Sequence, residues 1–220
     1  MSGRADYPST TIANENVIVY GNNNKWVKAS EPIDNSFEQV DSVSNDGGAE
    51  KYSPSASFAE KVESQNSGKR IILIPCAKGD TSILEWQRNL STGTLYGSML
   101  NRINTVTGSG TNPLSGIIMI QGENDSLNST DANLWASRFT QFVTDIRSDL
   151  GYAIKIFFVK LGDIPSPPTY WNVVRTQQES ISISGVYMVD VDDIWDDAIH
   201  FDTSRATAIG ERIGDEYLSS

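Results

Sequence analysis

The chain has 220 residues with a formal net charge of −11, and its apolar (38%) and charged (20%) fractions are those of an ordinary globular domain. An acidic chain without a run of Lys or Arg repels nucleic-acid phosphates and anionic lipid surfaces. No stretch approaches the ~18–20 apolar residues of a membrane span, and the N-terminus lacks signal-peptide zones. The only cysteine, Cys76, excludes an intrachain disulfide and a cysteine-rich metal site. We predict one soluble domain over residues 1–220 with no nucleic-acid or membrane partner, and leave oligomeric state and compartment open.

Strand and helix patterns alternate along the chain. Short, β-branched apolar runs flanked by turn residues predict strands at residues 17–20, 71–74, 117–120, 154–159 and 186–189. Helical spacing of apolar residues predicts helices around residues 58–62, 95–103, 134–146, 174–181 and 209–217. Nearly continuous apolar strands separated by helices favour a parallel sheet covered on both faces. The fold class is therefore α/β, a three-layer α/β/α sandwich with a central parallel sheet.

Two strand exits carry groups suited to stabilising an oxyanion. In a parallel sheet of this kind, the functional loops lie at the C-terminal ends of the strands. After residue 74 comes Gly79, whose backbone can approach a ligand and present an N–H. After residue 120 come Gln121 and Asn124, and either amide could donate a second hydrogen bond to the same oxygen.

The third exit leads to the only histidine of the chain. Asp197 precedes His200 by three residues. Histidine has the unperturbed pKa nearest neutrality, and a carboxylate on its Nδ1–H leaves Nε2 free to act as a base. These groups are the base, the orienting acid and the oxyanion donors of acyl transfer, although a lone histidine is more often a structural residue.

Other features of the chain have alternative interpretations. Residues 190–197 are strongly acidic but do not match the calcium-loop template, because Trp195 and Phe201 stand where it requires Gly and Glu. We therefore expect a solvated acidic loop there, with a weak ion site as the alternative, and assign no metal ligands. Trp86, Trp171 and Trp195 are expected to be packing residues, with sugar-pocket walls as the alternative.

Several segments together resemble a known family, the sialate O-acetylesterase-like carbohydrate esterases of the SGNH hydrolase superfamily. The resemblance rests on residues 118–125 (Ile-Met-Ile-Gln-Gly-Glu-Asn-Asp), 73–75, 78–82, Trp86, Leu95-Tyr96, Trp171, Val174-Arg175, Gln177 and 197–201. It implies a serine esterase that removes acetyl groups from sugars without metal or organic cofactor. It also implies His200 as general base, Asp197 as its orienting acid, and Gly79 and Gln121 as oxyanion donors.

The nucleophile is the point where the chain departs from the family pattern. In the family it lies in a Gly-Gln-Ser-Asn segment after the first strand, commonly followed by residues much like Met1 to Arg4 here. The resemblance therefore predicts that this strand and its serine lie upstream of Met1. Ser2 is the nearest substitute within the chain, and it would have to reach hydrogen-bond distance of the base from a displaced position.

Two further function classes stay open. A non-catalytic carbohydrate-binding copy of the esterase scaffold would explain the missing nucleophile segment. A lipase or thioesterase of the same superfamily is disfavoured, because the chain has no long apolar lid segment. The expected partner in the esterase interpretation is an acetylated saccharide or polysaccharide.

Overall fold

The computed structural model describes residues 5–6, 15–43, 51–66, 68–196 and 198–220. It divides into two compact units. The first unit contains residues 1–79 together with 200–220, and the second contains residues 80–199. That the whole chain forms one domain stays a prediction.

The first unit contains a three-stranded sheet with the order β2-β1-β3. Strand β1 (Val17–Tyr20) pairs in parallel with β3 (Ile71–Leu73) and antiparallel with β2 (Trp26–Lys28). In the turn that joins β1 to β2, the N–H of Gly21 donates to the carbonyl oxygen of Lys25 and its own carbonyl oxygen accepts the N–H of Asn24. Strand β2 was not predicted, since it has three residues and all are exposed.

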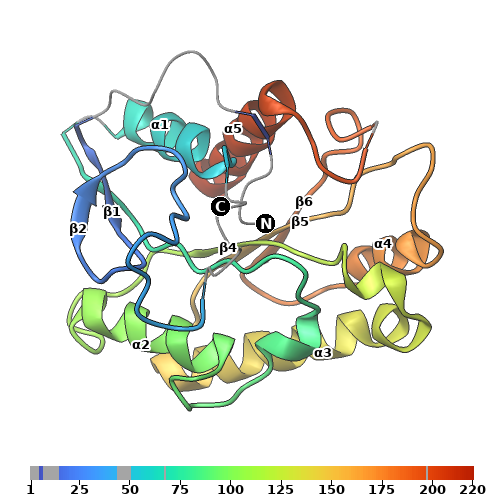
Figure 1. Cartoon of the computed structure of the whole chain (residues 1–220), viewed down its shortest axis with the longest axis horizontal. Coiled ribbons are helices and arrows are strands. Elements are labelled where there is room, and N and C mark those ends of the chain that lie inside the picture. Colours follow the sequence, from blue (N-terminus) through green and yellow to red (C-terminus); the bar gives the residue numbers. More distant parts are fainter. Residues whose placement is uncertain (1–4, 7–14, 44–50, 67, 197) are drawn as a thin grey trace. The chain divides into compact units, whose positions relative to one another are not determined.

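Helices α1 (Ser55–Gln65) and α5 (Thr203–Ser219) pack on each other in the first unit, as Figure 1 shows. Phe58 meets Tyr217 edge to face with ring centroids 5.8 Å apart. The close approach depends on Gly210, where a Cβ would lie 2.1 Å from Ser57 Oγ and 2.3 Å from the Pro54 carbonyl oxygen. A side chain at that position would force the two helices apart.

Gly210→Ala is therefore expected to destabilise the protein. Overpacking costs about 3 kcal/mol, of which about 1 kcal/mol is offset by the better helix propensity of alanine. The control is Gly214→Ala, where the new Cβ would approach the flexible Lys61 side chain most closely, at 2.7 Å, and lie at ordinary contact distance, 3.7 Å, from the nearest backbone atom, the Phe58 carbonyl oxygen. Thermal unfolding should show a melting temperature lower by roughly 4–8 °C for the first variant and a smaller change for the second. Equal melting temperatures for the two variants would contradict this account of the packing.

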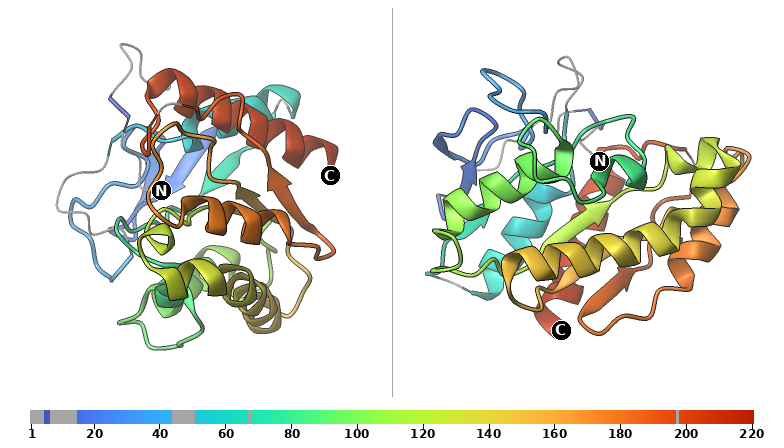
Figure 2. Two further views of the ribbon diagram at one scale, coloured as in Figure 1. Left: turned by 90° about the vertical axis from the view of Figure 1, so that its right-hand side faces the viewer. Right: turned by 90° about the horizontal axis from the view of Figure 1, so that it is seen from below.

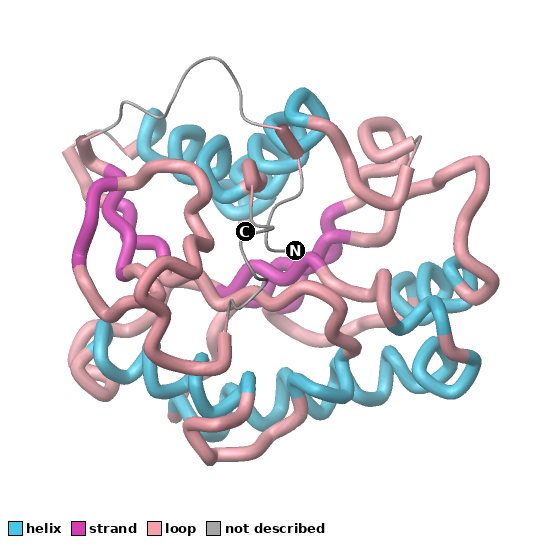
Figure 3. The backbone as a smooth tube through the Cα atoms, viewed as in Figure 1, coloured by secondary structure: helices cyan, strands magenta, loops and turns pink. Residues whose placement is uncertain are grey.

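The second unit contains a wholly parallel sheet with the order β4-β5-β6, from strands Ile117–Ile120, Ile156–Val159 and Val186–Val189. Figure 3 shows the strands of each sheet in magenta. Every residue of the central strand β5 is buried. The long helix α3 (Ser129–Leu150) supplies much of that burial, because Trp135 and Phe139 stack at 4.9 Å and both contact Phe158.

Helix α2 (Leu95–Thr107) runs beside α3 in Figure 2, and Tyr96 meets Phe142 edge to face. Helix α4 (Trp171–Glu179) packs against the other end of α3. Two short 3₁₀ helices, η1 (Ile83–Trp86) and η2 (Asp125–Leu127), follow the exits of β3 and β4 along the chain. The predicted alternation of strands and helices is thus confirmed, and so is the α/β fold class. No helix within the described ranges is long and apolar enough to cross a membrane.

Candidate active site

The predicted site residues are distributed over both units. Gly79 and His200 belong to the first unit, and Gln121 belongs to the second. Ser2 and Asp197 lie outside the described residues. The roles of these five residues therefore stay predictions, and the surroundings of the three described ones indicate what each can do.

His200 is exposed and lies shortly before the first residue of α5, and the two residues between them are fixed by contacts of their own. Phe201 is buried, at 2% exposure. Asp202 caps the helix, since its Oδ1 accepts the backbone N–H of Arg205 at 2.9 Å. A cap and a buried aromatic anchor fix the backbone beside His200 without engaging the imidazole, which suits a side chain that has to exchange protons with a substrate.

Gln121 lies at the exit of β4 within a buried hydrogen-bond network. Its Oε1 accepts the indole N–H of Trp135 at 2.8 Å. Its Nε2 donates to the carbonyl oxygen of Thr81 at 3.3 Å and to Asp125 Oδ2. Both amide hydrogens therefore have protein acceptors, and donation to an oxyanion requires Gln121 to give up one of them, of which the contact to Thr81 is the longer.

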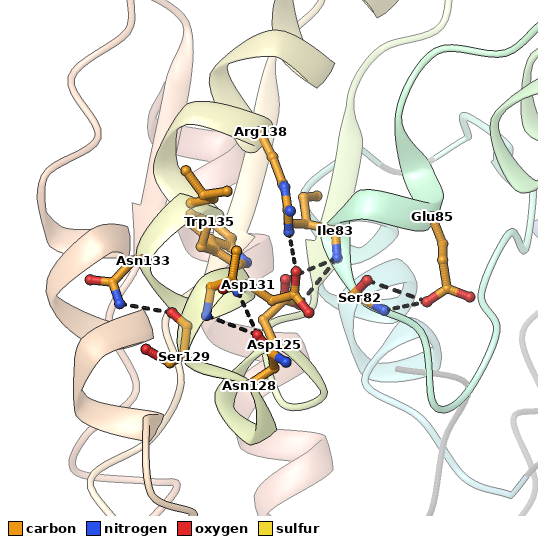
Figure 4. Close-up of polar contacts among 12 residues, drawn as sticks. Ser82, Ile83, Glu85, Asp125, Asn128, Ser129, Asp131, Asn133, Trp135 and Arg138 are labelled. Carbon is orange, nitrogen blue, oxygen red and sulfur yellow. Dashed lines mark hydrogen bonds and ion pairs between the residues drawn. The ribbon is translucent and has the colours of Figure 1, made fainter.

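Asp125 joins Gln121 to the backbone of Ile83, and Figure 4 shows its contact with Ile83. It is fully buried, and its two carboxylate oxygens lie 3.2 and 3.1 Å from the backbone nitrogen of Ile83. Burial raises the pKa of Asp125 to about 6, against the opposing effect of hydrogen bonds from Gln121 and Ile83. Both carboxylate oxygens face N–H donors, an arrangement that favours the ionised form and charge-assisted hydrogen bonds.

The loop after Gly79 is tied to the exit of β4 at three successive points. Besides the contacts of Thr81 and Ile83, the Nδ2 of Asn124 donates to the carbonyl oxygen of Asp80 at 2.9 Å. Asp80 itself has a φ of 58°, which places a non-glycine residue in the left-handed region. Such backbone geometry persists only where surrounding contacts hold it, and these three contacts do so.

Gly122 is required by the geometry of the same strand exit. Its φ is 132°, and a Cβ there would lie 3.0 Å from Val174 Cγ1 and 3.2 Å from Gln178 Nε2. Gln178 uses that nitrogen to donate to the backbone oxygen of Gln121 at 3.1 Å. The Gln-Gly pair therefore lets the chain turn closely against α4.

The first residues of the acidic stretch 190–197 form a cluster of ion pairs. Lys160, which directly follows β5 and is 3% exposed, lies 2.8 Å from carboxylate oxygens of both Asp190 and Asp192. Arg175 of α4 also pairs with Asp192, at 2.7 Å. Burial lowers the pKa of Lys160, but hydrogen bonds from its ammonium group to the two aspartates outweigh that effect and raise it. Asp190 is exposed as expected for a solvated loop, but it and the half-buried Asp192 also pair with a buried lysine, which the expectation did not include.

The three tryptophans considered as pocket walls are buried. Trp86, Trp171 and Trp195 are 6%, 0% and 0% exposed. Trp171 meets Trp195 edge to face at 5.7 Å, and the indole of Trp86 donates to Thr81 Oγ1 at 3.1 Å. All three are packing residues. Within the described ranges, no group of three or more His, Cys, Asp or Glu side chains is arranged to hold a metal ion.

Sequence reasoning missed two members of the network, Asp125 and Trp135. Asp125 is the last residue of the Gln-Gly-Glu-x-Asp motif, and its place four residues after Gln121 was an available signal. Trp135 gave no signal, because only the folded chain brings an α3 side chain against the β4 exit.

A family model and a curated relative that match this chain are both described as carbohydrate esterases. The family model described as "Carbohydrate esterase, sialic acid-specific acetylesterase" matches residues 1–219. A "Probable carbohydrate esterase" of Arabidopsis thaliana is 26% identical over 97% of this chain and 78% of its own length.

Several solved structures have a fold similar to that of this chain. An Arabidopsis thaliana protein structure has a TM-score of 0.84 at 23% identity and covers 100% of this chain and 94% of its own. NanS has a TM-score of 0.67 at 14% identity, over 94% and 88% of the two chains. A carbohydrate acetylesterase from Xanthomonas citri has a TM-score of 0.62 at 19% identity, over 76% and 41%. On the family match over nearly its whole length, this chain belongs to the sialic acid-specific acetylesterase family of carbohydrate esterases.

Proposed function

We propose that this protein is a serine esterase that removes O-acetyl groups from carbohydrates through an acyl-enzyme. A serine Oγ attacks the acetyl carbonyl carbon while Nε2 of His200 takes the serine proton, and Asp197 holds the resulting imidazolium. The imidazolium returns that proton to the departing sugar oxygen. Water then attacks the acetyl-serine with the same base, which releases acetate and restores the serine.

Gly79 and Gln121 are the proposed donors to the tetrahedral oxyanion. The observation that carries the proposal is the buried network that fixes the Gln121 amide and the backbone just after Gly79. Donors that are held in place before the reaction cost no reorganisation when charge develops. Family membership supplies the substrate class, an acetylated saccharide.

Two measurements on the purified full chain test this function together. The first is acetate release from O-acetylated sialic acid and from acetylated neutral saccharides. The second is the intact mass after exposure to a serine-reactive fluorophosphonate, with peptide mapping and His200→Ala as the control. We expect acetate release and a single adduct that depends on His200.

Mapping of the adduct identifies the nucleophile, for which Ser2 is the proposed residue within the chain. An adduct on another serine would remove Ser2 from the mechanism and keep the esterase. Sugar binding without acetate release or an adduct would instead support the non-catalytic copy of the scaffold.

A further inference from the structure

We propose that Asp125 is a positioning residue, which acts with Trp135 to hold the Gln121 amide in one of its two orientations and to tie it to the loop after Gly79. This inference rests on the proposed function, and it assigns to Asp125 no contact with substrate.

The orientation of the Gln121 amide follows from the chemistry of its neighbours. An indole N–H only donates, so Trp135 requires the oxygen of Gln121 on its side. An ionised carboxylate only accepts, so Asp125 requires the nitrogen. Trp135 and Asp125 contact opposite ends of the same amide. If the Gln121 amide were reversed, its NH₂ group would face the indole N–H, and its oxygen would face the Asp125 carboxylate, so both hydrogen bonds would be lost.

Burial makes this constraint strong. Asp125 and Trp135 are both 0% exposed, and Gln121 is 8% exposed. Water does not replace a missing hydrogen-bond partner at such a buried position. A donor without an acceptor therefore lowers the free energy of unfolding more than it would at the surface.

The second connection of Asp125 runs to the loop that follows Gly79. Its carboxylate accepts the N–H of Ile83, the first residue of η1. The Ser82 hydroxyl and Glu85 form a capping box at the same helix start, with the N–H of Ser82 donating to Glu85 Oε2 at 2.8 Å. Because η1 already has that cap, the Asp125 contact is an additional tie between this loop and the β4 exit.

The decisive variant is Asp125→Asn, which keeps the size of the side chain and removes its charge. The introduced amide has one accepting oxygen for two donors, the Ile83 N–H and Gln121 Nε2. We expect kcat for acetyl ester hydrolysis to fall about 10–100-fold, the loss expected when a preorganised donor is displaced, with KM changed by less than about threefold. The matched control is Asp131→Asn, because Asp131 pairs with Arg138 beside the network and does not contact Gln121.

A double variant separates positioning from simple structural support. Adding Trp135→Phe to Asp125→Asn removes the indole donor, so that Gln121 can reverse and accept from the introduced asparagine amide. We expect the melting temperature of the double variant to fall by less than the sum of the decreases in the two single variants. We expect kcat to stay low, because the amide is reversed. Recovery of kcat along with stability, or wild-type kcat in Asp125→Asn, would overturn the proposal.

The indole N–H resonance of Trp135 gives a readout that does not depend on activity. Assigned by its loss in Trp135→Phe, it should show slow hydrogen exchange in the wild type and faster exchange in Asp125→Asn. Unchanged exchange would refute the fixed amide. If the wild type neither releases acetate nor takes up the fluorophosphonate, the proposed function and the catalytic part of this inference both fall, and the exchange rates still decide whether Asp125 fixes Gln121.

Discussion

His200→Ala is expected to lower kcat/KM for acetyl ester hydrolysis by roughly 10³-fold or more without unfolding the protein. Without the imidazole no group takes the serine proton. The variant therefore loses both general base catalysis and the activation of the nucleophile, and such losses have effects of this size. His200 is exposed, so the truncation leaves no cavity. The measurements are steady-state kinetics with acetylated saccharides and thermal unfolding of both proteins.

Asp202→Ala is the matched control for this result. Asp202 lies two residues after His200 and caps α5, so its loss should destabilise the protein by about 1 kcal/mol and leave the chemistry intact. If both variants lose activity in proportion to stability, the histidine would be structural. A His200→Ala protein with wild-type kcat/KM would remove His200 from the mechanism.

Most of the fold was predictable because its signals are local. Each predicted strand is present, with β3 and β5 shorter than their apolar runs, since residues 74, 154 and 155 lie outside the ladders. Of the apolar positions of α3 that repeat at helical spacing, Phe139 packs against Phe158 of β5 and Phe142 packs against Tyr96 of α2. The strand β2 could not be predicted, because its three exposed residues carry no burial pattern.

The site was predictable as a set of residue types and not as a set of contacts. The position of Gln121 at a strand exit indicated a functional amide, but its side chain could be taken as free to donate. The structure places both its hydrogens on protein acceptors, Thr81 and Asp125. The pairing with Thr81 joins segments 40 residues apart in the chain, which no local pattern specifies.

The acidic stretch illustrates the same limit. Charge density alone suggested solvation, yet Lys160 is buried beneath Asp190 and Asp192 and pairs with both. A lysine directly after a buried strand was the available signal, since a buried ammonium group requires carboxylate partners.

Gln121→Ala is expected to lower kcat by about 10²–10³-fold if its amide donates directly to the oxyanion. The variant also leaves the buried N–H of Trp135 without its acceptor, which should destabilise the protein by about 1–3 kcal/mol. Loss of stability and loss of catalysis therefore have to be separated before the kinetic result is interpreted.

The double variant Gln121→Ala with Trp135→Phe makes that separation, because it removes the orphaned indole donor together with the amide. We expect part of the stability to return and kcat to stay low. Asn124→Ala is the comparison for the other amide of the motif, whose Nδ2 contacts the backbone of Asp80. A larger loss of kcat in Asn124→Ala than in Gln121→Ala would assign the second oxyanion donor to Asn124, and Gln121 would then act only by holding the loop after Gly79 in place.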